Sequence, residues 1–436
     1  MGAAPYGPSL LMVWRSTPLL LLLVVLTVAS AARSFSMNHP ATLDVDRASI
    51  LTAGAMLSDA GSSPASLQLR APGYPLVLTM LAKLDAEFSA GIACSSEERT
   101  NCAFGPVLDV LLLIQTVLPA IALVIAGAIA WELSRSVEIS AIMVCLTLLF
   151  GRFDDAPTGL FAHVWYLVTA MLAMYFLVSA LTHSNYARAV GTGVAIAAAA
   201  SFEPTFLIVA PTAMLALMRV GRGPAGAACL FAGCLAAVAI MIFVMHTLHY
   251  DPIALWRHSA WHLSERVAFN QLDEQSWWCG LLLPVPFIGG LATGLFPEPT
   301  VASFGYYVPG TFVHDGTNRI FPAVLSQPGG PLGQMRWLVN NYVILQPIDF
   351  LAASAPLFVR GLMAATGVLG LVGLLHIRRL LRWSSIEPSR AAVLAVLWCT
   401  GALLLANTLV TANPIGINPT LAFVFAYAVA YVACGA

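Results

Sequence analysis

The sequence predicts an all-α integral membrane protein, a bundle of about ten transmembrane helices with extracytoplasmic helical loops. Hydrophobic residues make up 59% of the 436 residues, charged residues only 9%, and the mean hydropathy is +0.83. A soluble domain carries about a quarter charged residues. This chain therefore lacks the polar side chains to cover itself in water, and the bilayer is its predicted solvent.

Each predicted span is an apolar run bounded by polar residues or prolines. The first run, preceded by Arg15 and ending in VASAA, also fits a cleavable signal peptide, but an uncleaved span is favoured. Two short runs flank Glu203-Pro204 and predict a helical hairpin, because proline disfavours helix in the residue before it. The runs are residues 17–32, 107–131, 137–151, 160–181, 190–200, 205–218, 225–247, 356–377, 391–410 and 421–436.

The distribution of arginine predicts the orientation, because cytoplasmic loops are enriched in Lys and Arg. With the N-terminus inside, the outside receives the first large loop, residues 33–106, and a long loop, residues 248–354. Within the long loop, residues 277–296 are apolar but rich in Pro and Gly, which favours a re-entrant segment and leaves a crossing open. The inside loops hold Arg135, Arg188, Arg219, Arg222, Arg378, Arg379, Arg382 and Arg390.

Two units follow from this layout, residues 1–220 with the first loop and residues 221–436 with the second. The net charge of −1 gives no basic field for nucleic acid. No internal repeat is evident, and the spans hold few ionisable residues, so the usual signatures of transporters and pumps are missing.

The first loop carries an acidic pair, Asp44 and Asp46, in the sequence LDVDR. Two such carboxylates can hold a divalent cation, Mg²⁺ or Mn²⁺, through oxygen ligands. Alternatively, one of them can act as a general base. A solvated acidic turn is the other interpretation, since D-x-D alone is a weak motif.

Two short helices are expected in the same loop. Residues 46–61 predict an amphipathic helix whose apolar residues, Ile50, Ala53 and Leu57, lie on the bilayer interface. A second short helix is expected from Leu76, after the turn-forming sequence RAPGYP. Beyond it, Cys94 and Cys102 flank CSSEERTNC and can form a disulfide if the loop faces an oxidising compartment. Two free thiols are the alternative.

The acid-bearing first loop, the small-residue-rich helix ASILTAGAMLS and the sequence RAPGYPL resemble the GT-C superfamily of polytopic glycosyltransferases. The chain is most similar to the bacterial relatives of dolichyl-phosphate-mannose–protein mannosyltransferases and lipid A aminoarabinose transferases. The resemblance covers roughly the first half, where VGTGVAIAAAASFEPTFLIVAP resembles the family's small-residue span ending in L-T-R-P. Two positions depart from the family: Ile50 or Leu51 replaces a tyrosine that often follows the acid, and Glu203 replaces the arginine.

The resemblance implies a membrane enzyme, with its active site on the extracytoplasmic face of a bacterial inner membrane. It would move a sugar, with inversion, from a polyprenyl-phosphate donor to a lipid, glycan or protein acceptor. By position, Asp46 or Asp44 is the implied base, with Asp46 slightly favoured. A leaving phosphate needs cations or hydrogen-bond donors. Arg70 and Tyr74 in RAPGYPL are the first candidates, and a snorkelling interfacial arginine is the alternative for Arg70.

Further polar candidates lie in other loops. His258, His262 and Arg266 share one helical face. An interfacial helix is the favoured interpretation, followed by phosphate contact, and a zinc site is the least favoured because no third ligand is evident. Asp154 and Asp155 predict acceptor orientation or a metal contribution, with a solvated, helix-capping turn as the alternative.

The aromatic segment 305–318 predicts a sugar or acceptor cleft, or a structural cover. Two functions outside glycosyl transfer also remain open. One is a membrane transporter or flippase, and the other is a catalytically degenerate GT-C-like assembly protein.

Overall fold

The structure is a computed structural model, and its described residues form an all-α membrane protein. They are 92% helical, and three of their helices are long and apolar enough to cross a membrane. The predicted spans 17–32, 356–377 and 421–436 lie outside them. The described residues are 44–45, 47–57, 71–96, 102–134, 136–137, 139–141, 144, 159–160, 162–183, 185–218, 223–248, 392–393, 395–396, 399 and 403.

Three predicted spans are confirmed as long helices: α5 (Pro106–Ser134), α7 (His163–Thr182) and α10 (Gly223–Thr247). The predicted break at Glu203-Pro204 is also present. It separates α8 (Tyr186–Phe202) from a 3₁₀ turn, η2 (Pro204–Ile208), and the short helix α9 (Val209–Leu217). Only scattered residues of the predicted spans 137–151 and 391–410 are described.

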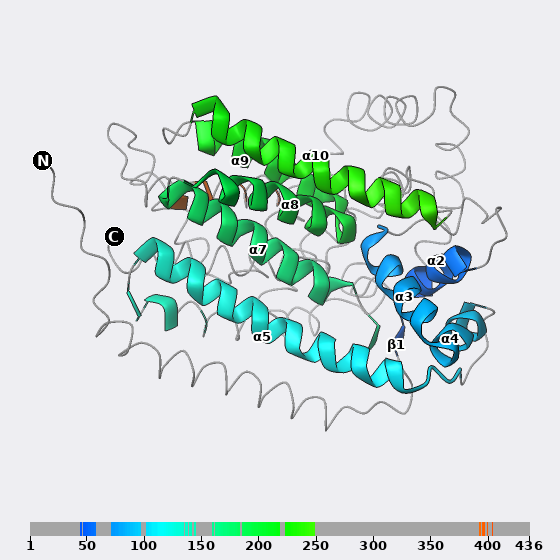
Figure 1. Ribbon diagram of the computed structural model, residues 1–436. Coiled ribbons are helices and arrows are strands. Elements are labelled where there is room, and N and C mark those ends of the chain that lie inside the picture. The colour runs from blue at the N-terminus through cyan, green and yellow to red at the C-terminus, as the bar shows by residue number, and fades with distance from the viewer. Residues whose placement is uncertain are drawn as a thin grey trace, which may run out of the picture.

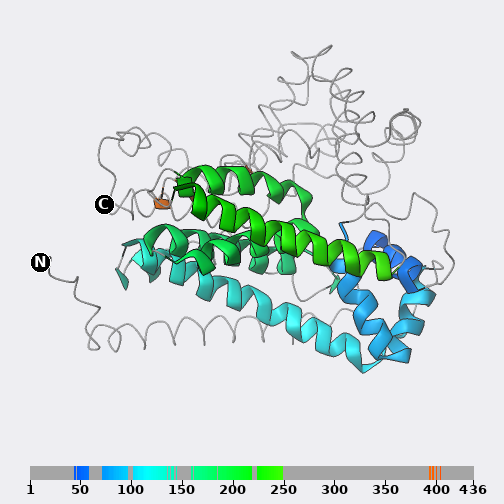
Figure 2. The same ribbon diagram turned by 45° about the horizontal axis from the view of Figure 1, so that its top comes forward.

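The long helices pack as successive neighbours, α5 on α7, α7 on α8 and α8 on α10 (Figures 1 and 2). The closest approach is between α8 and α10. A Cβ added at Gly193 would lie 2.0 Å from the Leu230 carbonyl oxygen, and one at Gly233 would lie 2.3 Å from that of Val190. Membrane helices associate through such small residues because lipid offers no hydrophobic driving force between them.

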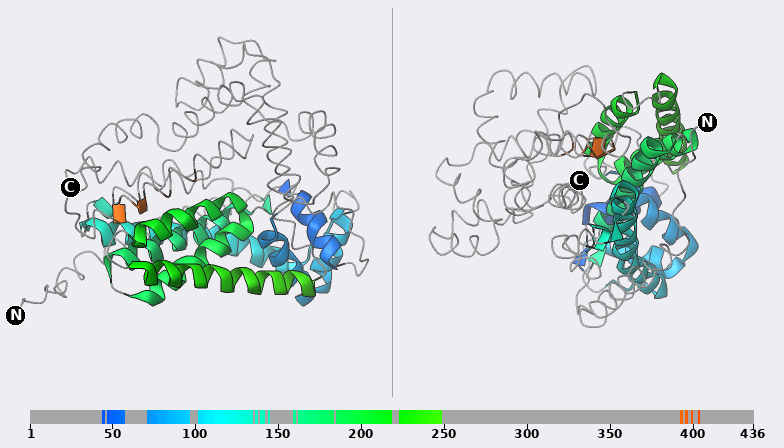
Figure 3. Two further views of the ribbon diagram at one scale, coloured as in Figure 1. Left: turned by 90° about the horizontal axis from the view of Figure 1, so that it is seen from above. Right: turned by 90° about the vertical axis from the view of Figure 1, so that its left-hand side faces the viewer.

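The helices of the first loop gather at one end of this bundle (Figures 1 and 3). They are α2 (Arg47–Leu57), α3 (Gly73–Leu84) and α4 (Ala86–Ser96), and each packs on the other two. The second helix starts at Gly73, three residues before the expected Leu76. Asp85 caps α4, since its Oδ1 accepts the backbone N–H of Phe88 at 2.7 Å.

The expectation that Ile50 and Ala53 of α2 face the bilayer interface is wrong. Ile50 and Ala53 are 1% and 0% exposed and belong to a small core within the first loop. Their partners in that core include Leu78 of α3 and Phe88 of α4. Met56, on the same helix, packs with Met245 near the end of α10. An apolar helical stripe is equally suited to lipid and to a protein core, and here the neighbouring helices cover it.

The α8–α10 contact gives a test of the bundle. Gly233→Ala should lower the free energy of unfolding by about 1–3 kcal/mol, because the new Cβ meets backbone atoms that move only if the helices separate. Gly191→Ala is the matched control, since its Cβ would meet only the Phe176 ring, at 3.3 Å. Unfolding in mild detergent, followed by circular dichroism, measures both. Equal losses in the two variants would contradict the packing described here.

Candidate functional site

Two short parallel strands join the first loop to the segment that precedes α7. In the pairing of β1 (Asp44–Val45) with β2 (Gly159–Leu160), Asp44 lies opposite Gly159 and Val45 opposite Leu160. Asp44, the first acid of the sequence LDVDR, is therefore held beside the segment 159–160 that precedes α7. No periodicity in the sequence signals this pairing.

A helix begins directly after each strand. The helix α2 starts at Arg47, two residues after Val45, and α7 starts at His163, three residues after Leu160. The first N–H groups of a helix have no partner within it and form the positive end of its dipole. The strand with Asp44 thus lies beside two helix starts, an environment that favours negative charge.

The start of α3 contacts the end of α8 without a gap. A Cβ added at Gly73 would lie 2.6 Å from Ser201 Oγ and 2.9 Å from both Phe202 Cδ1 and the Ser201 carbonyl carbon. Only glycine fits here, so the sequence RAPGYP has its glycine where the first loop meets the bundle.

One residue later, a buried polar contact fixes α3 to the bundle. The Tyr74 hydroxyl donates to Gln115 Oε1 of α5 at 2.8 Å, and Trp165 Nε1 of α7 donates to the same oxygen at 3.4 Å. Tyr74 is 1% exposed and Gln115 is 0% exposed. The Trp165 ring stacks on Phe202, with centroids 6.4 Å apart and planes at 17°. Side chains of α3, α5, α7 and α8 therefore meet at one point.

Glu203 has a local structural role. Its Oε1 accepts from Thr205 Oγ1 at 2.8 Å and from the Thr205 backbone N–H at 3.4 Å. Glu203 therefore caps η2, the turn that follows the break in the helix.

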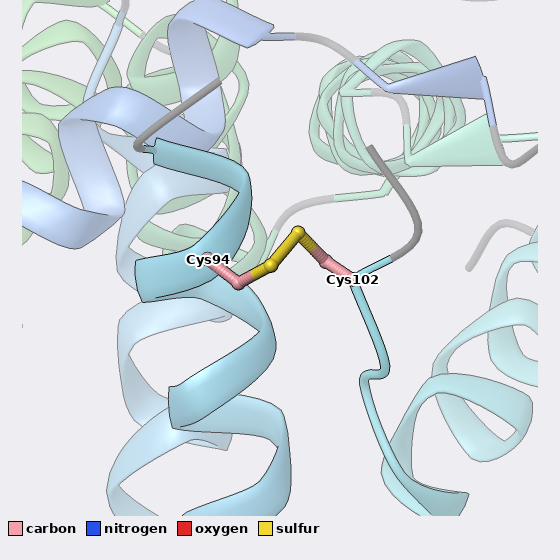
Figure 4. The surroundings of a disulfide bond; sticks show 2 residues. All are labelled: Cys94 and Cys102. Carbon is pink, nitrogen blue, oxygen red and sulfur yellow. A yellow bond between two sulfur atoms is a disulfide. The ribbon is translucent and has the colours of Figure 1, made fainter. Parts of the chain in front are cut away.

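The first loop is closed by a disulfide between Cys94 and Cys102, whose Cα atoms are 5.7 Å apart (Figure 4). The bond joins the last turn of α4 to the extended segment before α5. Phe88 and Phe104 pack beneath it with ring centroids 5.8 Å apart. The bridge therefore fixes α4 to the start of α5.

Two of the predicted site residues fall within the described part of the chain. The backbone of Asp44 lies in β1, and Tyr74 is buried in α3 with its hydroxyl on Gln115. The described ranges hold no group of three or more His, Cys, Asp or Glu that suits a metal, and they do not test the proposed cation at the acidic pair. The predicted residues outside them are Asp46, Arg70, Asp154, Asp155, His258, His262 and Arg266, together with the segment 305–318.

Gln115 and Trp165 were missed as candidates from the sequence. A lone glutamine within an apolar run is a usable signal, because a buried amide in a membrane helix needs a partner. The identity of that partner is set by tertiary structure, since Tyr74 lies 41 residues and Trp165 lies 50 residues from it.

The contact at Gly73 predicts a local loss of order. Gly73→Ala should speed hydrogen exchange in residues 73–84, because the new methyl group pushes α3 away from Ser201 and Phe202. Exchange in α7 and α10 should stay at the level of the parent. Mass spectrometry of peptic fragments measures this, with Gly191→Ala as the control on α8. Unchanged exchange over residues 73–84 would mean that α3 is not held at this point.

No protein-family model matches the chain, and no curated protein matches it.

Proposed function

We propose that the protein is an inverting glycosyltransferase that moves a sugar from a polyprenyl-phosphate donor to an acceptor at the extracytoplasmic membrane face. The observation that carries this proposal is the β1–β2 pairing, which holds the Asp44 strand at the end of an apolar bundle, beside the starts of α2 and α7. Under this proposal, the end of the bundle that carries the Asp44 strand faces the extracytoplasmic side.

The reaction uses one aspartate as a base. A carboxylate of Asp46 or Asp44 takes the proton of the acceptor hydroxyl as its oxygen attacks the anomeric carbon. The new carbon–oxygen bond forms on the face opposite the phosphate. The old bond breaks, and its electron pair leaves with the polyprenyl phosphate, so the configuration inverts. Arg70 neutralises the charge that grows on the phosphate. In an alternative arrangement, the two aspartates hold a divalent cation that binds this phosphate.

The lipid part of the donor fits the outer face of α5. Its exposed apolar residues recur every three or four positions, so they share one side of the helix: Val110, Leu113, Val117, Ile121 and Val124. Trp165 lies in the first turn of the α7 span, Val164–Thr182, the depth at which Trp and Tyr mark the membrane interface. A polyprenyl chain beside α5 would then present its phosphate near this level.

The disulfide and the arginines support the proposed sidedness. Disulfides persist in oxidising compartments, and Cys94–Cys102 lies in the first loop. Arg188 lies near the start of α8, at the end where α7 finishes with Thr182. Cationic residues at that end fit the cytoplasmic side, and in a bacterium the membrane is then the inner membrane.

The base is tested by Asp→Asn substitutions, which remove the charge and change the size of the side chain little. Asp46 directly precedes Arg47, the first residue of α2, in the sequence, a position where Asn is tolerated about as well as Asp. Asp46→Asn should therefore lower kcat by about 10²- to 10⁴-fold without loss of stability, and Asp44→Asn is compared beside it. Arg70→Ala should lower kcat by about 10²- to 10³-fold.

The assay supplies purified protein with polyprenyl-phosphate sugars and candidate acceptors. Asp109→Asn, on an exposed residue in the first turn of α5, is the control that should leave transfer unchanged. Transfer at the parent rate by both Asp44→Asn and Asp46→Asn would remove the proposed mechanism. A parent without turnover would favour the assembly protein, and solute movement that survives both substitutions would favour the transporter. Loss of activity with a chelator would place a cation at the acid pair.

The sidedness is tested through the two cysteines of the first loop. In intact cells, a membrane-impermeant maleimide should label Cys94 and Cys102 only after a reductant opens their bond. Mass spectrometry of the labelled peptide measures this, and Cys94→Ser/Cys102→Ser is the control for background labelling. Labelling that needs permeabilised cells would place the first loop inside.

A further inference from the structure

The side chain of Gln115 is polar, whereas the helix around it is largely apolar. It is 0% exposed and lies in the first half of α5. A buried amide without hydrogen bonds costs several kcal/mol relative to water, and leucine would fill similar space in α5 without that cost. The presence of an amide at this position is therefore explained by the hydrogen bonds that it accepts.

Gln115 joins two separate elements, α3 and α7, to its own helix α5 through one atom. Its Oε1 accepts the Tyr74 hydroxyl from α3 and the Trp165 indole N–H from α7. The geometry of both donors is fixed, because Tyr74 is buried and Trp165 is stacked on Phe202. A shift of α3 along the bundle would break the shorter of these hydrogen bonds.

The helix held by this contact supports the acidic strand. The helix α3 packs on α2, which begins two residues after β1 and its Asp44. The Gly73 contact with Ser201 holds the same end of α3. The start of α3 is thus held by a close backbone contact and by a buried hydrogen bond, one residue apart.

We propose that Gln115 is a positioning residue that holds the start of α3 on the bundle and, through α2 packed on α3, the strand that carries Asp44. The role of Asp44 rests on the proposed function, whereas the hold on α3 rests on the geometry alone. A misplacement of about 1 Å can cost about 100-fold in rate. Loss of the contact should therefore act on kcat more than on the KM for the donor.

The key variant removes both partners of the hydrogen bond. In Tyr74→Phe/Gln115→Leu, the hydroxyl and the amide are both removed, so neither is left buried and unsatisfied. The Trp165 N–H loses its acceptor, but Trp165 is only partly buried, so the loss of stability should be small. We expect a fall in kcat of roughly 10- to 100-fold, a donor KM within about threefold of the parent and an unfolding midpoint like that of the parent. The single variant Gln115→Glu keeps an acceptor oxygen at the same place, so its kcat should be closer to that of the parent than to that of the double variant. Parent-like kcat in the double variant would overturn the proposal, as would a fall in kcat matched by a fall in stability.

A spectroscopic readout separates this proposal from the proposed function. The indole N–H resonance of Trp165, assigned by its absence in Trp165→Phe, should shift in Gln115→Leu because its acceptor is lost. Exchange over residues 73–84 should rise in the double variant, with α10 unchanged. If the parent transfers no sugar, the proposed function fails, but these two measurements still test whether Gln115 holds α3 on the bundle. A Trp165 resonance and an α3 exchange rate like those of the parent would show that it does not.

Discussion

The lack of water within the bilayer is the constraint on which this structure depends. Each polar group at membrane depth must find a partner inside the protein, and several hydroxyl groups of the bundle find one on their own helices. Thr116 donates to the Leu112 carbonyl, and Thr192 donates to that of Arg188, each one turn back. Gln115 is too long and too polar for that solution, and it accepts hydrogen bonds from α3 and α7. A buried polar contact between separate elements thus lies where the first loop meets the bundle.

The same constraint explains why the sequence predicts the long helices well. A helix satisfies its own backbone, so an apolar run of sufficient length is enough to place α5, α7 and α10, with ends that differ from the expected ones by a few residues. The break at Glu203-Pro204 could also be predicted, because proline disrupts a helix through its own backbone. Pro119, by contrast, lies inside α5 without ending it, since neighbouring helices in a bundle compensate for the lost hydrogen bond.

The parts that the sequence did not predict depend on distant partners. The apolar stripe of α2 fits lipid and protein equally, and only the positions of α3 and α4 decide that Ile50 and Ala53 are buried. The β1–β2 pair joins segments whose residues carry no mutual signal. For the candidate site, Asp44 and Tyr74 were predicted from sequence motifs, but the burial of Tyr74 against Gln115 depends on the tertiary fold.

The position of Asp44 depends on helix packing more than on the strand that contains it. A two-residue parallel pair supplies few hydrogen bonds, each with a net contribution of about 0.5–1.5 kcal/mol. Burial of one large apolar side chain contributes about 1.5–3 kcal/mol, and α2 buries Ile50 and Met56 directly after the strand. The α2 helix, packed on α3 and α4, is therefore what keeps the acidic strand at the end of the bundle. Because α3 is itself fixed by Gly73 and Tyr74, the acid and the bundle are linked through a single packed unit.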